Sequence, residues 1–180
     1  MGKRINGTIG ITGANGFIAW HLVNTLRYIH KYDRYVLITK EDFQENGALF
    51  EKVAKCDVIV HFAAVNRSSD EMLLFRSNKN IIDDLIDSMH KVDKFPRFIN
   101  ISSIHETQDS AFGMSKRYTR RSLEKYYHQF PEQLTTIIAP NIFGAFCKPN
   151  YNSVVATFCH SLIAGNALNV NGASRIRLVY

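Results

Sequence analysis

The sequence is poor in cysteine and has no long hydrophobic run. It contains three cysteines among 180 residues, widely spaced, which excludes both a disulfide framework and a zinc knuckle. No apolar stretch approaches the roughly 20 residues of a membrane-spanning helix, and the polar start 1–4 lacks the apolar core of a signal peptide. We therefore expect a cytoplasmic protein with reduced thiols, no metal site and no membrane partner.

Acidic residues are also relatively few. The chain has 22 Lys and Arg against 16 Asp and Glu, which gives a formal net charge of +6 at pH 7. The densest basic run, 116–121, falls on a predicted helix, where such a run is more often a solvated face or an anion site than a DNA surface. We therefore expect no nucleic-acid partner. The hydrophobic content of 46% and the charged content of 21% are ordinary for one globular domain.

What the chain does contain is a regular alternation of strand and helix signals joined by short connections. Such an alternation is typical of a parallel sheet with helices on both faces, so we predict an α/β, Rossmann-type doubly wound fold. The predicted strands are 7–12, 35–39, 57–62, 97–102 and 134–139. The predicted helices are 16–31, 45–55, 71–91 and 112–129, followed by a polar loop, a helix near 152–164 and a terminal strand at 175–180.

A glycine-containing turn at 12–19 joins the first strand to the first helix. Gly13 permits a tight turn, and Gly16 lets backbone N–H groups approach a ligand without an intervening Cβ. Backbone amides and the positive end of a helix together form a site for a pyrophosphate, so the turn predicts a dinucleotide site. The residues of this turn predicted to contact the dinucleotide are Gly13, Asn15, Gly16, Phe17 and Ile18.

The second and third strands carry further candidate cofactor contacts. At the end of the second strand, a base suits the 2′-phosphate of NADP and an acid the 2′-hydroxyl of NAD. Lys40 favours NADP at this position, while the adjacent Glu41 leaves NAD open. Asp57 starts the third strand and can accept a hydrogen bond from the adenine amino group. The small Ala63 and Ala64 at the end of that strand allow a cofactor to lie against the backbone.

The fourth strand and the helix after it carry a second group of candidate residues. Strand 97–102 is followed by Ser103 at the carboxyl edge, where ligands bind in this class of sheet. Phe112 and Lys116 are four residues apart and share one helix face. Because that face would look across at Ser103, the spacing predicts that the three residues border one site.

These motifs resemble those of the extended short-chain dehydrogenase/reductase superfamily of nucleotide-sugar epimerases, dehydratases and reductases. The turn resembles its TGxxGxxG motif, with Ala19 in place of the third glycine, and HFAA at 61–64 resembles its third-strand motif. The resemblance implies that Asn78 is the structural asparagine of the active site. It also implies that Ser103 is the catalytic serine and that Lys116 is the lysine of the YxxxK motif.

A more specific resemblance is to the N-terminal domain of bifunctional capsular-polysaccharide UDP-sugar reductases. It rests on VNR at 65–67, SSIHETQD at 102–109, PNIFG at 140–144 and CKPNYNSVVATFC at 147–159. It implies reduction of a UDP-4-keto-6-deoxy-hexosamine with NADPH, in the synthesis of UDP-N-acetyl-L-fucosamine for capsular or O-antigen polysaccharide. The substrate-binding residues that it implies are Asn78, Ser103, His105, Asn141, Lys148 and Asn150.

The same resemblance implies a domain layout. Residues 1–139 would form the cofactor-binding core, and 140–180 would start a substrate lobe. The remainder of that lobe, and a metal-binding cupin domain, would be absent from this chain. The sequence leaves open whether the protein forms a homodimer.

Phe112 is the main departure from the family pattern. The superfamily has a tyrosine here, whose phenol exchanges a proton with the sugar oxygen while the lysine holds the nicotinamide ribose. Phenylalanine has no ionisable oxygen, and loss of a positioned general acid costs about 10²–10⁴ in rate. Three hypotheses follow: a reductase or epimerase of low activity, a dinucleotide-binding module without turnover, or a truncated gene fragment. His105 and Tyr118 are conceivable substitutes for the phenol, but their spacing selects neither.

Overall fold

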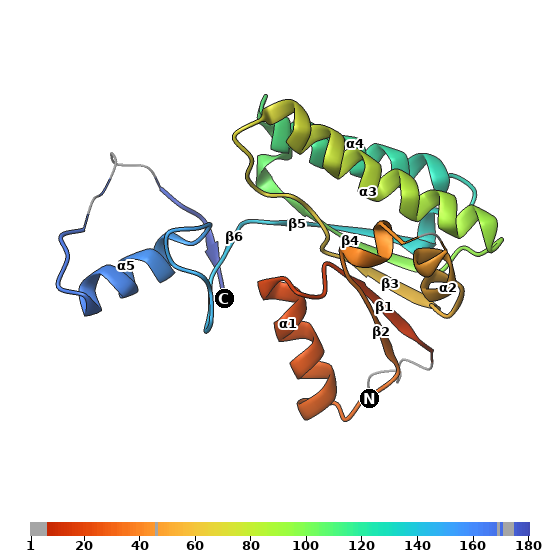
Figure 1. Cartoon of the computed structure of the whole chain (residues 1–180), viewed down its shortest axis with the longest axis horizontal. Coiled ribbons are helices and arrows are strands. Elements are labelled where there is room, and N and C mark those ends of the chain that lie inside the picture. Colours follow the sequence, from red (N-terminus) through yellow and green to blue (C-terminus); the bar gives the residue numbers. More distant parts are fainter. Residues whose placement is uncertain (1–6, 46, 169, 171–174) are drawn as a thin grey trace. The chain divides into compact units, whose positions relative to one another are not determined.

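The computed structural model describes residues 7–45, 47–168, 170 and 175–180. The chain divides into two compact units, Met1–Ile138 and Ala139–Tyr180. The first unit holds the helices α1 to α4 and the larger sheet, and the second holds α5 and two short strands (Figure 1).

A five-stranded sheet forms the centre of the first unit, in the order β2-β1-β3-β4-β5. Its described strands are β1 Ile9–Thr12, β2 Tyr35–Ile38, β3 Val58–His61, β4 Arg97–Ser103 and β5 Leu134–Ala139. β1 pairs in parallel with β2 and with β3, and β3 pairs in parallel with β4. The carboxyl ends of these four strands therefore share one edge. The strand order reverses between β1 and β3, and such a switch point is where sheets of this kind bind ligands.

Helices cover both faces of this sheet. They are α1 Phe17–Asn24, α2 Ala48–Ala54, α3 Glu71–Lys91 and α4 Ala111–Tyr126, with the short turns η1 Thr25–Ile29, η2 Glu41–Phe43, η3 Ile104–Thr107 and η4 Pro131–Gln133. α3 and α4 pack side by side (Figure 1). Both begin at side-chain caps, which satisfy N–H groups that have no partner within a helix. Asp70 accepts from the N–H of Leu73 at 3.0 Å, and Ser110 accepts from that of Gly113 at 3.1 Å.

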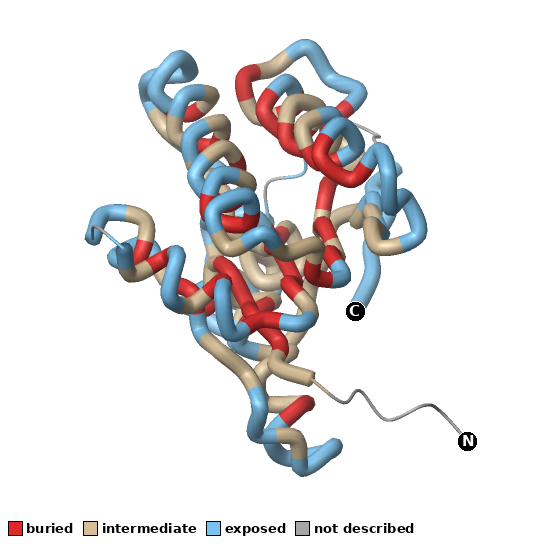
Figure 2. Tube along the Cα trace, turned by 90° about the vertical axis from the view of Figure 1, so that its right-hand side faces the viewer, coloured by how far each residue is buried: buried red, intermediate tan, exposed pale blue. Residues whose placement is uncertain are grey.

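Two apolar clusters hold the sheet between these helices. The buried members of the cluster under α1 are Ile9, Ile11, Ala19, Leu26 and Val60. The larger cluster includes Ile59 of β3, Ile82 of α3 and Leu123 of α4. Because Ile59 and Val60 are neighbours on one strand, they point to opposite faces. Figure 2 shows the buried residues running along the strands and the inward sides of the helices. The α/β fold class and the five predicted strands of this sheet are confirmed.

Some boundaries differ from the prediction. The helix predicted at 16–31 is α-helical only to Asn24 and then widens into the π-helical turn η1. Tyr32 follows this turn and donates a hydrogen bond from its hydroxyl to the carbonyl of Gly7, so the chain returns to the sheet earlier than a regular helix would allow. The helix predicted at 45–55 begins only at Ala48, because Gly47 takes φ 89°. α4 ends at Tyr126 rather than at 129.

The second unit is small and largely exposed. β6 Asn141–Ile142 pairs in parallel with β7 Leu178–Val179, and α5 spans Val154–Ile163 without a buried residue. The terminal strand predicted at 175–180 is therefore only two residues long. Its two side chains are 42% and 43% exposed, so little burial is available to stabilise a longer strand.

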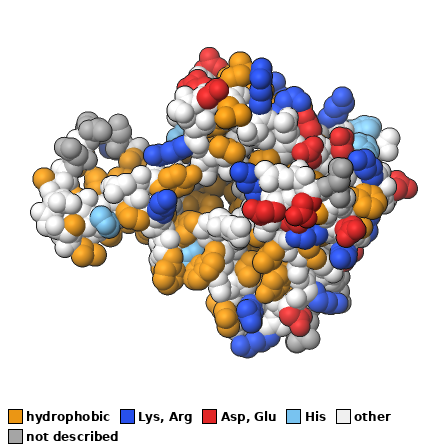
Figure 3. All heavy atoms as spheres, viewed as in Figure 1, with side chains coloured by type: hydrophobic (Ala, Val, Ile, Leu, Met, Phe, Trp, Pro, Cys, Tyr) orange, Lys and Arg blue, Asp and Glu red, His pale blue; other side chains and the backbone are white. Residues whose placement is uncertain are grey.

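Surface features bear on the classes of partner. In the part of the chain that the structure describes, no helix combines the length and apolar character needed to cross a membrane. The same residues contain no group of three or more His, Cys, Asp or Glu placed to hold a metal ion. On the face drawn in Figure 3, acidic and basic side chains are interspersed over the region of α3 and α4. The positive charge is therefore not gathered into one patch in this view.

Candidate functional site

The glycine turn leads from the end of β1 directly into α1. Gly13 has φ 65°, and a Cβ built on it would lie 2.9 Å from both Cα and N of Ala63. Only glycine fits such a position comfortably. Gly16 precedes α1 without a side-chain cap, and a Cβ there would lie 3.0 Å from the carbonyl oxygen of Gly13. The first N–H groups of α1 are therefore available to an anion, as a pyrophosphate site requires.

The remaining residues of the turn differ in burial. Asn15 is exposed, and Phe17 and Ile18 are half-buried, so all three border the surface at which a ligand would arrive. Ala19 is fully buried and packs in the cluster under α1. Its methyl group occupies the position of the third glycine without displacing the helix from the sheet. The half-buried Ala64 follows Ala63 and extends the same surface along the end of β3.

A buried histidine ties β1 to β3 behind this turn. Thr12 Oγ1 accepts hydrogen bonds from the N–H groups of Phe62 at 3.1 Å and Ala63 at 3.2 Å. Since both lone pairs are then used, its proton points to His61 Nδ1, 2.9 Å away. His61 is thus neutral with its proton on Nε2. Burial, assisted by the nearby charge of Lys116, lowers the pKa of His61 to about 3. The histidine has a structural role.

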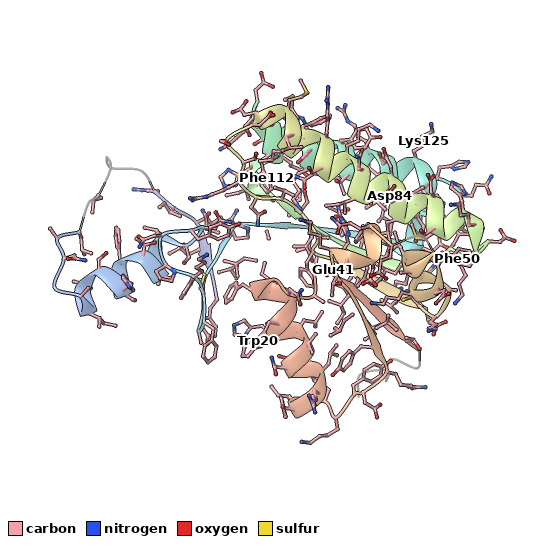
Figure 4. The ribbon with its side chains drawn as sticks, viewed as in Figure 1. Trp20, Glu41, Phe50, Asp84, Phe112 and Lys125 are labelled. Carbon is pink, nitrogen blue, oxygen red and sulfur yellow. The ribbon has the colours of Figure 1, made fainter. Side chains whose placement is uncertain are left out.

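Lys40 and its neighbours lie just past the end of β2. Lys40 is exposed and can reach a ligand at the carboxyl edge, and Glu41 beside it is labelled in Figure 4. Asp42 is buried and accepts from the Thr39 N–H at 2.7 Å and from Lys52 Nζ at 2.7 Å. Burial tends to raise the pKa of Asp42, but the hydrogen bonds from Lys52 and Thr39 outweigh it and lower the pKa. The carboxylate of Asp42, paired with Lys52, holds the loop after β2 in place. The exposed Lys40 in the same loop is then the candidate to bind a 2′-phosphate.

The prediction that Asp57 contacts adenine is wrong. Asp57 precedes Val58, which pairs with Ile9 at the amino end of β1. Gly13 follows the carboxyl end of β1, so the two residues lie at opposite edges of the sheet. The carboxylate of Asp57 instead accepts from the N–H of Thr8 at 2.8 Å. It joins the starts of two strands. Because the start of a parallel strand lies at the amino edge, the position of Asp57 in the predicted strand already argued against a ligand contact.

Ser103, Phe112 and Lys116 all lie at the carboxyl edge: Ser103 ends β4, and Phe112 and Lys116 stand in the first turns of α4. Lys116 Nζ lies 5.7 Å from the centroid of the Phe112 ring and donates to the carbonyl oxygen of Ile101 in β4 at 3.2 Å. Phe112 stands in the first turn of α4 (Figure 4) and is half-buried. Ser103 ends β4, and its Oγ accepts from the N–H of His105 at 3.2 Å, which leaves the hydroxyl proton free for a ligand oxygen.

A buried carboxylate that sequence reasoning missed stands behind this face. Glu106 accepts from Ser102 Oγ at 2.7 Å and pairs with Arg120 Nε at 3.3 Å. Burial lowers the pKa of Lys116 to about 8, and the negative charge of Glu106 opposes part of that decrease. The carboxylate fixes η3 against α4 and helps Lys116 to stay charged. The sequence held no signal for it, because its burial arises only when η3 folds onto α4.

Asn78 occupies an internal position on α3. Its Oδ1 accepts from the N–H of Val65 at 2.6 Å, and its Nδ2 donates to the carbonyl of Val65 and to Ser115 Oγ, each at 3.0 Å. The side chain is almost fully buried and its hydrogen bonds join three segments. It therefore positions the segment after β3 against α4, and its amide and oxygen are used within the protein rather than offered to a substrate.

Ser103 and His105 lie in the first unit, and the three other predicted substrate residues belong to the second unit. Asn141 lies in β6 and donates its N–H to the carbonyl of Arg177 at 3.2 Å. Lys148 Nζ lies 5.5 Å from the centroid of the Tyr151 ring. Asn150 takes φ 53° and donates its N–H to Thr157 Oγ1 at 2.9 Å. These contacts order the loop between β6 and α5, and their role toward a substrate stays a prediction.

The first unit is thus a parallel α/β domain with a glycine turn at its switch point, and with a serine and a buried lysine at the same edge. This combination defines a dinucleotide-binding domain. The chain belongs to the NAD dependent epimerase/dehydratase family, whose model matches residues 9–177. Membership implies a nicotinamide dinucleotide as cofactor, and the close approach of Gly13 to Ala63 and the uncapped start of α1 fit such a ligand.

Similar proteins place the chain more narrowly. It is 32% identical over 171 residues to the UDP-2-acetamido-2,6-beta-L-arabino-hexul-4-ose reductase of Pseudomonas aeruginosa, covering 94% of this chain and 45% of that protein. The crystal structure of the capsular polysaccharide assembling protein CapF from Staphylococcus aureus is 31% identical with a TM-score of 0.77, covering 96% of this chain and 46% of that one. These findings confirm the predicted relation to capsular-polysaccharide enzymes. The chain spans a little under half the length of both relatives.

A more distant structure supports the fold alone. The UDP-N-acetylglucosamine 4-epimerase of Methanobrevibacter ruminantium, solved with UDP-N-acetylmuramic acid, is 16% identical with a TM-score of 0.80. It covers 97% of this chain and 69% of that one. The backbone of the dinucleotide-binding domain is therefore shared far beyond the reductases.

Proposed function

We propose that this chain is the dinucleotide-binding part of an NADP-dependent reductase or epimerase that acts on a UDP-4-keto-6-deoxy-hexosamine in capsular or O-antigen polysaccharide synthesis. The observation that carries the proposal is the contact of the buried Lys116 with the Phe112 ring and with Ile101 near the end of β4, where Ser103 lies, at the sheet edge that also holds the glycine turn. The Pseudomonas relative, named as a hexul-4-ose reductase, supports this substrate class.

Each residue of the edge then has a defined task. The N–H groups at the start of α1, just after Gly16, hold the pyrophosphate, and Lys40 binds the 2′-phosphate that distinguishes NADP. Lys116, which lies on α4, holds a hydroxyl of the nicotinamide ribose. Ser103 donates a hydrogen bond from its hydroxyl to the carbonyl oxygen of the sugar. A bound reduced nicotinamide would supply the hydride.

Residues of the second unit complete the proposal as contacts to the nucleotide sugar. Asn141, Lys148 and Asn150 lie in or near the loop that follows β6, and Lys148 offers a positive charge to a diphosphate. Residues 140–180 would then be the start of a substrate lobe.

Phe112 limits the chemistry of this site. Its ring can pack against a ligand, but it cannot donate the proton that a carbonyl oxygen needs as it becomes a hydroxyl. The same observation favours a second candidate function, a module that binds the dinucleotide and a UDP-sugar without turning them over. The two functions differ in rate and share the binding site.

Reinstating the phenol tests the proposal. We expect Phe112→Tyr to accelerate reduction of the UDP-4-keto-6-deoxy sugar by about 10²–10⁴, the usual contribution of a positioned general acid. The measurement is the loss of NADPH absorbance at saturating cofactor. Phe50→Tyr is the matched control, since Phe50 is a half-exposed phenylalanine on α2, well away from Phe112 (Figure 4).

One result would overturn the enzymatic proposal, and another would overturn the limit ascribed to Phe112. If Phe112→Tyr reduces the sugar no faster than Phe50→Tyr does, the chain is not the reductase proposed. The second candidate function, a binding module, would then remain if calorimetry still detects binding of NADPH. If the unmodified chain already turns over at an ordinary enzymatic rate, Phe112 does not limit the reaction.

A further inference from the structure

We propose that the imidazole of His105 donates the proton that the missing phenol would have donated. The inference rests on the proposed reductase function and adds a residue to it. It starts from a chemical need: a carbonyl oxygen held by Ser103 must receive a proton from a group close to Phe112, at the carboxyl edge and within reach of water.

Tyr118, the other conceivable donor, is directed elsewhere. Its hydroxyl donates to Asp83 Oδ1 of α3 at 2.9 Å. Its ring lies 6.2 Å from that of Phe75 between centroids, and Lys79 Nζ lies 5.2 Å from its centroid. These contacts place the phenol in the packing between α3 and α4. The Tyr118 hydroxyl cannot donate a proton to a substrate oxygen at Ser103 without breaking these contacts.

His105 is joined to both residues that define the position. The centroid of its ring lies 6.5 Å from that of Phe112, with the planes at 63°. Its backbone N–H donates to Ser103 Oγ at 3.2 Å. The imidazole is half-buried, so it is accessible to water. The histidine therefore stands beside the ring that lacks the oxygen and beside the serine that holds the substrate oxygen.

The hydrogen bond of His105 to Gln108 selects the nitrogen that acts. Nδ1 lies 2.9 Å from Gln108 Oε1, and an amide oxygen can only accept, so Nδ1 carries a proton in both charge states. Nε2 is then the nitrogen that gains and loses the second proton. Imidazole is the side chain best suited to this exchange near neutral pH.

The step balances once the proposed cofactor is counted as the reductant. A bound reduced nicotinamide would supply a hydride to the carbonyl carbon, and the electron pair of the C=O π bond would move to the oxygen. That oxygen takes the proton from Nε2 of the imidazolium, which becomes neutral imidazole and is reprotonated by water. The products are the sugar alcohol and the oxidised dinucleotide.

Four proteins test the proposal: the unmodified chain, His105→Gln, Phe112→Tyr and the double variant. We expect His105→Gln to lower the residual rate of NADPH-dependent reduction at least about tenfold, because it removes the general acid. In the Phe112→Tyr background the same substitution should change the rate less than about twofold, since the phenol then donates the proton. His128→Gln, a surface histidine on the same unit whose Nδ1 contacts the Lys125 carbonyl, is the control.

A second readout does not depend on turnover. In ¹⁵N spectra of histidine side chains, the resonance that His105→Gln abolishes should shift when the UDP-sugar is added together with NADP⁺. Calorimetry should give the same NADPH affinity for His105→Gln and for the unmodified chain, because the imidazole lies on the substrate side.

The outcomes separate the two proposals. If Phe112→Tyr fails to reduce the sugar, the proposed function fails. If Phe112→Tyr is active but His105→Gln leaves the residual rate of the unmodified chain unchanged, the proton comes from another group such as Lys116, and the inference about His105 fails. An equal loss in both backgrounds would also overturn it, since the phenol should make the imidazole dispensable.

Discussion

The turn between β1 and α1 and the face formed by Ser103, Phe112 and Lys116 border the same edge of one sheet, yet they depend on the sequence in different ways. The turn acts through backbone N–H groups and needs only that Gly13 and Gly16 carry no Cβ. The face acts through side-chain atoms. Phe112 packs against Lys116 but has no oxygen with which to donate a proton.

The comparison separates the proposed binding site, which depends on backbone atoms, from the proposed chemistry, which depends on side-chain atoms. A site built from backbone does not require a particular side chain at its border, where Ala19 is buried. A site built from one ionisable group does require that side chain. A neighbouring group can replace it as proton donor only if a specific contact holds that group in the right position. His105 has such a contact, and Tyr118 is committed to Asp83.

The largest effect should come from breaking the turn. Gly13→Ala places a Cβ 2.9 Å from the backbone of Ala63 and imposes φ 65° on an L side chain. The left-handed conformation alone costs about 1–2 kcal/mol, and the clash adds about 1–3 kcal/mol. We expect NADPH affinity, measured by calorimetry, to fall by on the order of a thousandfold, about 4 kcal/mol.

Gly47→Ala is the matched control for this prediction. Gly47 has φ 89°, but a Cβ there meets nothing within 4 Å, so it shares the backbone penalty without the clash. If the two variants bind NADPH equally well, close approach of β1 to β3 is not what forms the cofactor site.

A smaller effect should come from Lys116 in the face formed by Ser103, Phe112 and Lys116, through the pH dependence of the free energy of unfolding. Folding lowers the pKa of Lys116 from 10.5 to about 8, so between these values the unfolded chain binds more protons than the folded one. The free energy of unfolding should therefore rise as pH increases from 8 to 10.5, and Lys116→Met should lack that contribution. At about 1.4 kcal/mol per pKa unit, the difference over the whole range is at most about 3.5 kcal/mol.

Urea denaturation at pH 8 and pH 10 measures this difference. Lys125→Met is the control, because Lys125 lies exposed on the same helix (Figure 4) and should leave the pH dependence unchanged. An identical pH slope in Lys116→Met and the unmodified chain would mean that the lysine is not buried at this face.

The smallest effect concerns the choice of cofactor at the end of β2. We expect the chain to bind NADPH more tightly than NADH, and Lys40→Glu to reduce that preference about tenfold, since one exposed charge contributes about 1 kcal/mol. Lys55→Glu makes the same charge change at an exposed position beyond α2 and should have no effect. Equal affinities for the two dinucleotides in the unmodified chain would contradict the role of Lys40.

Much of the fold was predictable because it follows from local patterns. The strands of the larger sheet alternate with helices, and the glycine turn lies where the pattern changes from strand to helix. Boundaries were less predictable where tertiary contacts intervene, as at η1, where Tyr32 returns to Gly7. The site shows the same division: the placement of Ser103, Phe112 and Lys116 at the carboxyl edge follows from spacing, whereas the hydrogen bond between Asp57 and the Thr8 N–H depends on how β1 and β3 pair.

By itself, the sequence determined the glycines of the turn, the absence of an oxygen at Phe112 and the α/β alternation, since these are covalent or local facts. Only the tertiary structure decided that Lys116 is buried, that Glu106 stands behind it and that His105 rather than Tyr118 faces Phe112. Burial and the partners of a charged group arise from contacts between segments far apart in the chain. No pattern of neighbouring residues contains them.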